Sequence, residues 1–231
     1  MKLYSLLLML PQEVAADDGL VNLLVQRFNE GGEFMWPVLV SLIIGLAIAF
    51  ERIITLNRAD INTRKFIVTV KGALEEDGIA AAEAVCANTR GPVASVFQAG
   101  LLRHDEGIEA VEKAIVSYGS IEMSFLERGL VWLSLFISLA PMFGFLGTVV
   151  GMVAAFDAIE KAGDISPSLV ANGIKVALLT TVFGLITAII LQFFYNYVIS
   201  KIDRIVIDME EAAIELIDSL VLLRAGRPGS E

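Results

Sequence analysis

Three long stretches without a formal charge constrain this sequence more than any other feature. They cover residues 34–50, 129–156 and 176–200, and each has a charged residue at both ends. An α-helix rises about 1.5 Å per residue, and the hydrocarbon core of a bilayer is about 30 Å thick. The first stretch, with its flanking residues, is therefore just long enough to cross a membrane, and the other two exceed a crossing. They predict an all-α integral membrane protein with three transmembrane helices.

Composition excludes several function classes. The formal net charge is -10, whereas a nucleic-acid partner requires a basic face. Cys86 is the only cysteine and His104 the only histidine, so an intrachain disulfide and a histidine-based metal cluster are excluded. The sequence contains no phosphate-binding loop, nucleophile elbow or dinucleotide fingerprint. We therefore expect neither an enzyme nor a cofactor-binding protein.

The distribution of Lys and Arg predicts the orientation. Residues 57–128 and the segment after residue 200 are rich in both, whereas residues 158–173 contain only Lys161. The positive-inside rule then places the N-terminus in the periplasm and the C-terminus in the cytoplasm. The expected order is a periplasmic segment (1–33), transmembrane helix 1 (34–56), a cytoplasmic helical domain (57–128), transmembrane helix 2 (129–157), a periplasmic loop (158–173), transmembrane helix 3 (174–200) and a cytoplasmic helix and tail (201–231).

The two long spans are expected to extend as helices into the cytoplasmic domain. No residue obliges the helix that begins at Ile108 to stop before Pro141, which is a candidate kink point, and the third span continues as an amphipathic pattern to Leu220. Earlier in the domain, Asp60 is the expected cap of a helix that reaches Glu76.

The chain ends carry weaker signals. Lys2 and the apolar residues 3–10 are similar to the core of a signal peptide, and residues 20–28 have the pattern of an amphipathic surface helix. The tail from Ala225 onward is expected to be disordered.

Small residues recur at spacings of three and four in the second and third spans, and threonines lie among them. The small residues are Gly144, Gly147, Gly151, Gly173, Ala177, Gly184 and Ala188; the polar residues are Thr148, Thr180, Thr181 and Gln192. Such stripes let membrane helices pack closely, and a threonine can bond back to its own helix. The same polar side chains could instead line a proton pathway. The residues alone leave both interpretations open.

No Asp or Glu lies within any of the three uncharged stretches. Proton carriers inside membranes are usually carboxylates or histidines, so a proton pathway here would need a titrating group from a second protein. Lys175 and Asp157 stand at the expected periplasmic mouth. Lys175 either extends to the interface or pairs with Asp157, with Asp164 or with a partner.

Two stretches have a recognisable pattern: LAPMFGFLGTVVGMVAAF (139–156), and the stretch from Gly173 to Asn196, which contains LLTTVFGL. They resemble the second and third spans of the MotA/TolQ/ExbB proton channel family. The resemblance, closest to the ExbB type, extends over most of the chain. It implies a bacterial inner-membrane protein of which five copies form a ring around an ExbD- or TolR-like single-span partner that supplies a membrane aspartate. Protons would pass that aspartate beside Thr148 and Thr181, with Thr180 and Gln192 behind them.

The resemblance further implies that the ring uses the proton-motive force to energise TonB-dependent outer-membrane transport. There are three alternatives: a TolQ-like role in envelope integrity through a TolA-like protein, a passive membrane scaffold, and a stand-alone ion channel. One position departs from the family pattern: Val176, beside Lys175, stands where ExbB-type sequences often have a glutamate.

Overall fold

The computed structural model describes residues 19–163 and 167–225, and the part it describes is helical with no strand. The helices, in chain order, are α2 (Leu20–Glu30), α3 (Met35–Ala59), α4 (Thr63–Glu76), α5 (Ile79–Asn88), α6 (Pro92–Leu101), the 3-10 helix η1 (His104–Glu106), α7 (Ile108–Leu126), α8 (Leu130–Ala162) and α9 (Pro167–Ala225). The predicted all-α class is confirmed. The signal-peptide-like residues 2–10 and the tail beyond Ala225 lie outside the described residues.

Three of these helices are long and apolar enough to cross a membrane, as the three uncharged stretches predict. Within the most apolar window of each, only 22 to 28% of the residues are buried inside the chain. Large aliphatic and aromatic side chains cover the exposed remainder; Ile43, Phe145, Ile189 and Phe193 are examples. Such surfaces are stable in lipid rather than in water, because unfavourable hydration of apolar surface is avoided there.

The chain divides into two compact units. The first unit consists of residues 1–42 and 138–189, and the second of residues 43–137 and 190–231. In the first unit, α8 and α9 pack through small residues. Ala140, Ala155, Ala177 and Thr180 are all at most 4% exposed.

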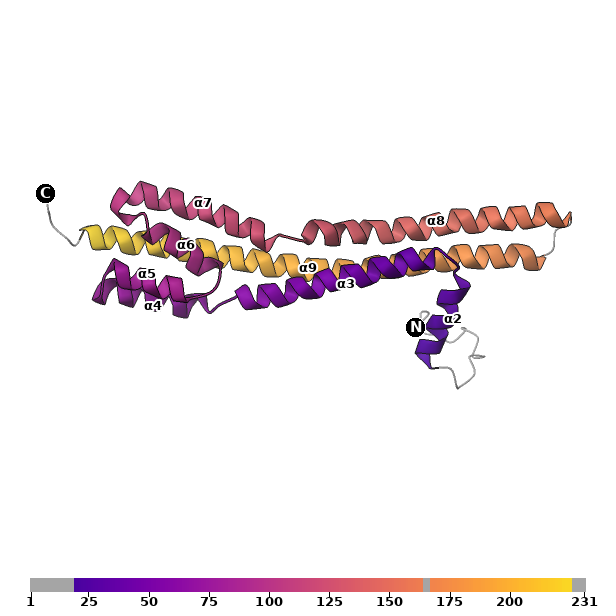
Figure 1. Ribbon diagram of the computed structural model, residues 1–231, viewed down its shortest axis with the longest axis horizontal. Coiled ribbons are helices and arrows are strands. Elements are labelled where there is room, and N and C mark those ends of the chain that lie inside the picture. The colour runs from indigo at the N-terminus through magenta and orange to yellow at the C-terminus, as the bar shows by residue number, and fades with distance from the viewer. Residues whose placement is uncertain (1–18, 164–166, 226–231) are drawn as a thin grey trace, which may run out of the picture. The chain divides into compact units, whose positions relative to one another are not determined.

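The second unit contains a conventional apolar core. Helices α4 to α7 gather along the C-terminal part of α9, which is yellow in Figure 1. Residues of α9 that recur at spacings of three and four enter this core: Val198, Ile202, Ile205, Met209, Ala212, Leu216 and Leu220. They confirm that the third span continues as an amphipathic helix to Leu220. Phe97 and Phe66 meet with their ring centroids 5.3 Å apart.

Two local predictions in the second unit were wrong. The helix that begins at Ile108 does not continue into the second span, because α7 ends at Leu126 and Gly129 has a φ of +89° that a helix cannot accommodate. The cap of α4 is Asn62, whose side chain accepts a hydrogen bond from the backbone of Lys65 at 3.0 Å. Asp60 pairs with Lys201 instead.

Helices also occupy most of the segment that was expected to be a loop over 158–173. Helix α8 extends to Ala162 and α9 begins at Pro167, so both continue past their uncharged stretches. Pro141 lies inside α8 and does not end it. Proline is tolerated within a membrane helix because neighbouring groups satisfy the freed carbonyl.

Candidate functional site

A pair of threonine hydroxyls joins α8 to α9 inside the first unit. The Oγ1 atoms of Thr148 and Thr181 are 2.7 Å apart, and either can donate. The Gly144 carbonyl oxygen lies 3.1 Å from the Thr148 hydroxyl and 3.3 Å from the Thr181 hydroxyl, so it can accept from whichever of them does not donate to the other. The structure thus brings together the two threonines that the sequence selected, on two different helices.

Glycines make this approach of the two helices possible. A Cβ on Gly144 would lie 2.8 Å from the Thr180 carbonyl oxygen and 3.2 Å from the Thr181 Cα. A Cβ on Gly184 would lie 2.7 Å from the Ala140 carbonyl oxygen. The two small-residue stripes therefore face each other within one chain, and any side chain at these glycines would force the helices apart.

The remaining stripe residues follow the same pattern. A Cβ on Gly151 would meet the backbone of Ala177 and Gly173 at 3.2 Å, and one on Gly147 would meet the Thr180 side chain at 2.6 Å. Ala177 is buried. The packing interpretation of the stripes thus has direct geometric support, alongside the hydroxyl pair.

The polar residues of the second and third spans differ in exposure. Thr180 is fully buried and donates to the Ala177 carbonyl at 2.9 Å, whereas Thr148 and Thr181 are half-buried. Their outer surfaces remain available to a group from outside the chain. Gln192 belongs to the second unit and is exposed, and its side-chain amide donates to the side-chain oxygen of Asn196 at 3.0 Å. The small residue Ala188 is half-buried.

Lys175 forms an ion pair within the first unit, and its partner is not Asp157. Asp164, the other acid named from the sequence, lies outside the described residues. The Lys175 Nζ lies 2.9 Å from the carboxylate of Glu30 in α2, and Arg27 contacts the same carboxylate at 2.9 Å. The hydrogen bond from Lys175 holds the pKa of Glu30 below its usual value, against the opposing effect of desolvation. Asp157 is exposed, and the described residues provide no ion pair for it.

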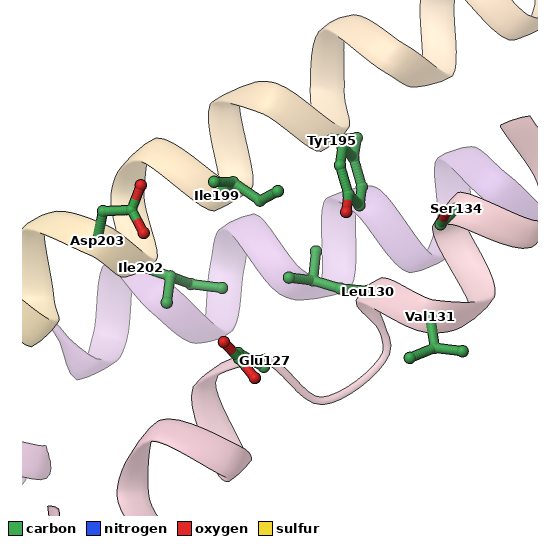
Figure 2. A pocket seen from close by; sticks show the side chains of 8 residues that line it. All are labelled: Glu127, Leu130, Val131, Ser134, Tyr195, Ile199, Ile202 and Asp203. Carbon is green, nitrogen blue, oxygen red and sulfur yellow. The ribbon is translucent and has the colours of Figure 1, made fainter. Parts of the chain in front are cut away.

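The second unit contains a hollow of about 430 Å³ beside the start of α8 (Figure 2). Glu127, Leu130, Val131 and Ser134 line it from the α7–α8 side, and Tyr195, Ile199, Ile202 and Asp203 line it from α9. Figure 2 shows the carboxylates of Glu127 and Asp203 on opposite sides of this hollow. Its lining is aliphatic at Leu130, Val131, Ile199 and Ile202 and acidic at Glu127 and Asp203.

Sequence reasoning missed Glu30 as the partner of Lys175 and missed Glu127 and Ser134 altogether. Glu127 is the C-cap of α7, two residues before Gly129. A glycine at the edge of an uncharged stretch is the signal that could have revealed the break. In the described part of the chain, no three His, Cys, Asp or Glu side chains gather closely enough to hold a metal ion.

Comparisons with known proteins identify one matching family. Residues 88–211 match the profile of the MotA/TolQ/ExbB proton channel family. The chain is 33% identical to a putative biopolymer transport protein ExbB homolog of Methanothermobacter thermautotrophicus, over 78% of this chain and 64% of that protein. It is 29% identical to the putative biopolymer transport protein ExbB-like 1 of Synechocystis, over 77% and 71%. It is also 34% identical to the Tol-Pal system protein TolQ of Haemophilus influenzae, over 36% and 37%.

Proposed function

Because the chain belongs to the MotA/TolQ/ExbB proton channel family, we propose that it is the ring subunit of a motor driven by the proton-motive force in a bacterial inner membrane. Five copies surround a single-span, ExbD-like partner, and the complex energises TonB-dependent outer-membrane transport. The N-terminus is periplasmic and the C-terminus cytoplasmic. The chain spans 64% of the length of the Methanothermobacter relative, so these activities and partners are proposals for this chain.

The observation that carries the proposal is the hydroxyl pair of Thr148 and Thr181, 2.7 Å apart across α8 and α9. Each hydroxyl is both a donor and an acceptor, so a half-buried pair can orient its protons toward a group on a neighbouring helix. Neither hydroxyl ionises near neutral pH. The pair can therefore position a proton carrier but cannot replace one.

The carrier has to come from another chain. Neither Asp nor Glu occurs between residues 34 and 50, 129 and 156, or 176 and 200. An aspartate on a partner helix beside the threonine pair would accept stronger hydrogen bonds in its charged form than in its neutral form. Thr180 supports the pair from within the helix contact, and Gln192 and Asn196 continue the polar surface of α9 in the second unit.

The similarity to TolQ keeps a role in envelope integrity as the second candidate, with the same motor and a TolA-like protein as recipient. Detergent sensitivity of cells that lack the protein, scored beside uptake of an iron chelate, separates the two roles. Loss of uptake with an intact envelope favours the first role, and the reverse result favours the second.

The experiment that tests the motor is complementation of such cells with Thr148→Val/Thr181→Val. Valine keeps the shape but removes both hydroxyls. We expect uptake to fall at least about tenfold, since a hydrogen bond to a charged group contributes about 1.5–3 kcal/mol. Proton flux into vesicles that contain the chain and its partner should fall in parallel, while native mass spectrometry detects an unchanged complex.

Two control variants make the result specific. Thr148→Ser/Thr181→Ser keeps both hydroxyls and should retain most of the activity. Thr69→Val removes an exposed hydroxyl that also bonds to a helix carbonyl four residues earlier, and it should have no effect. Full activity of the double valine variant would leave helix packing as the sole role of the pair.

A further inference from the structure

The hollow in the second unit lies where both long apolar stretches meet charged sequence. The stretch 129–156 begins directly after Arg128, and the stretch 176–200 ends directly before Lys201. Glu127 and Asp203, which line the hollow, flank these two boundaries. In the proposed orientation this level is the cytoplasmic interface of the membrane.

The two carboxylates of the hollow have no cationic partner in the part of the chain that the structure describes. Glu30, Glu51, Asp60, Glu106 and Glu215 all form ion pairs with Lys or Arg there, whereas Glu127 and Asp203 form none. Leu130, Ile199 and Ile202 provide aliphatic walls between them. A hollow with an aliphatic lining and two carboxylates that form no ion pair is complementary to a side chain with an aliphatic stem and a cationic head.

Polar residues extend the hollow along one face of α9. Gln192, Asn196, Asp203 and Glu210 are separated by 4, 7 and 7 residues, which are close to whole turns, and all four are exposed. This face of the second unit thus becomes more acidic from Gln192 toward Glu210. A cationic segment that leaves a membrane would encounter increasing negative charge along it.

We propose that this hollow docks the Lys- or Arg-bearing residues immediately cytoplasmic of the single-span partner's membrane helix. The inference rests on the proposed function, which supplies that partner. A single-span helix whose short end is cytoplasmic carries Lys and Arg there by the positive-inside rule. Those cations stand at the same membrane level as Glu127 and Asp203, so the hollow fixes the depth and orientation of the partner helix.

The lining disfavours an anionic lipid in this position, because its phosphate would face two carboxylates and no lining residue is a cation. A neighbouring copy of this chain is the main competing occupant. It could offer Arg128 or Arg204, which are exposed and form no ion pair among the described residues. The test therefore has to distinguish the partner from a neighbouring copy.

The test compares full-length wild type with Glu127→Gln/Asp203→Asn, each purified with the single-span protein that co-purifies with the chain. Native mass spectrometry at increasing NaCl concentration counts both components. We expect the variant to hold the partner at least about tenfold more weakly, because two charge-assisted contacts are lost, and to keep its own copy number. The variant Glu112→Gln/Asp218→Asn, which changes two exposed acids of α7 and α9 outside the hollow, should behave as wild type.

Cross-linking locates the contact. Asp203→Cys should form a disulfide with a cysteine placed immediately cytoplasmic of the partner's membrane helix. Ser219→Cys, near the C-terminal end of α9, should not. The native thiol does not interfere, because Cys86 is buried and desolvation raises its pKa to about 12.

The possible outcomes separate failure of the proposed function from failure of the docking site. If wild type captures no single-span protein, both the proposed function and the docking site fail. If the hollow variant holds the partner as tightly as wild type at every salt concentration, the docking site fails and the proposed function stands. If the variant instead loses copies of the chain itself, the hollow belongs to the contact between copies, which also overturns the assignment to the partner.

Discussion

The two units of this chain pack their helices in different ways. In the first unit, the buried side chains that α8 and α9 contribute are alanines and threonines, and glycines bring the two backbones together. In the second unit, the buried core includes large side chains such as Phe97, Leu74 and Leu216. One helix, α9, contributes to both units.

The difference reflects the solvent expected around each contact. Between helices in lipid there is no hydrophobic driving force, so association depends on close backbone contact and hydrogen bonds such as the Thr148–Thr181 pair. In water, burial of apolar area stabilises at about 25 cal/mol per Å², which favours large side chains. The comparison predicts that opposite kinds of substitution damage the two units.

Removal of volume should damage the second unit most. Phe97 is 1% exposed and packs on Phe66, so Phe97→Ala leaves a cavity in the core. We expect it to lower the free energy of unfolding of this unit by about 3–5 kcal/mol. Thermal unfolding of the purified protein, followed by hydrogen exchange of residues 63–126, measures the loss.

The control for this substitution is Val68→Ala on α4, because Val68 is 71% exposed. It should change the stability by less than about 0.5 kcal/mol. If Phe97→Ala and Val68→Ala had the same small effect, the apolar core would not be the source of the second unit's stability.

Addition of volume should damage the first unit. In Gly184→Val, the new side chain would collide with the Ala140 carbonyl and with Gly144. We expect a cost of about 1–3 kcal/mol and separation of Thr148 from Thr181. Faster hydrogen exchange of residues 177–187 in a detergent or lipid environment would report the separation.

Gly119→Val in α7 is the matched control, because no atom lies within 4 Å of a Cβ added at Gly119. That substitution should be tolerated. An equal loss from both glycine substitutions would indicate that backbone propensity, rather than contact between α8 and α9, limits the stability.

Periodicity explains why much of this molecule could be predicted from its sequence. The spans follow from uncharged stretches, and the threonine pair follows from small residues spaced by three and four. These signals are local and repeat along a helix, so single residues do not alter them. The continuation of α9 to Leu220 was predictable for the same reason, since its buried positions keep one spacing.

Single residues and contacts distant in sequence account for what could not be predicted. Gly129 lies in the short turn between α7 and α8 with a positive φ, although its neighbours have no breaking tendency of their own. Asn62 rather than Asp60 caps α4, and Asp60 pairs instead with Lys201 from far along the chain. The pairing of Lys175 with Glu30 joins residues on α9 and α2 whose proximity no local pattern encodes.

The ion pair between Lys175 and Glu30 provides a further test of how the helices of the first unit are held together. It attaches α2 to α9 in the first unit by charge, whereas α8 attaches to α9 by shape. Glu30→Gln should loosen α2 and raise hydrogen exchange of residues 21–30 about two- to fivefold near pH 6, since exposed ion pairs contribute little. Glu33→Gln removes a neighbouring exposed charge that has no ion pair among the described residues and should leave exchange unchanged.

The pH dependence gives the sign of the effect. The pKa of Glu30 is lower in the folded protein than its usual value of 4.5, mainly because of the hydrogen bond from Lys175. Because the pKa of Glu30 is lowered in the folded protein, its ion pair with Lys175 stabilises α2 fully above pH 4.5. This stabilisation is lost as the pH falls through the lower pKa of the folded protein. The difference in exchange between wild type and Glu30→Gln should therefore persist from neutral pH to about pH 5 and vanish at lower pH. A difference that grew on acidification would mean that α2 is attached by something other than this ion pair.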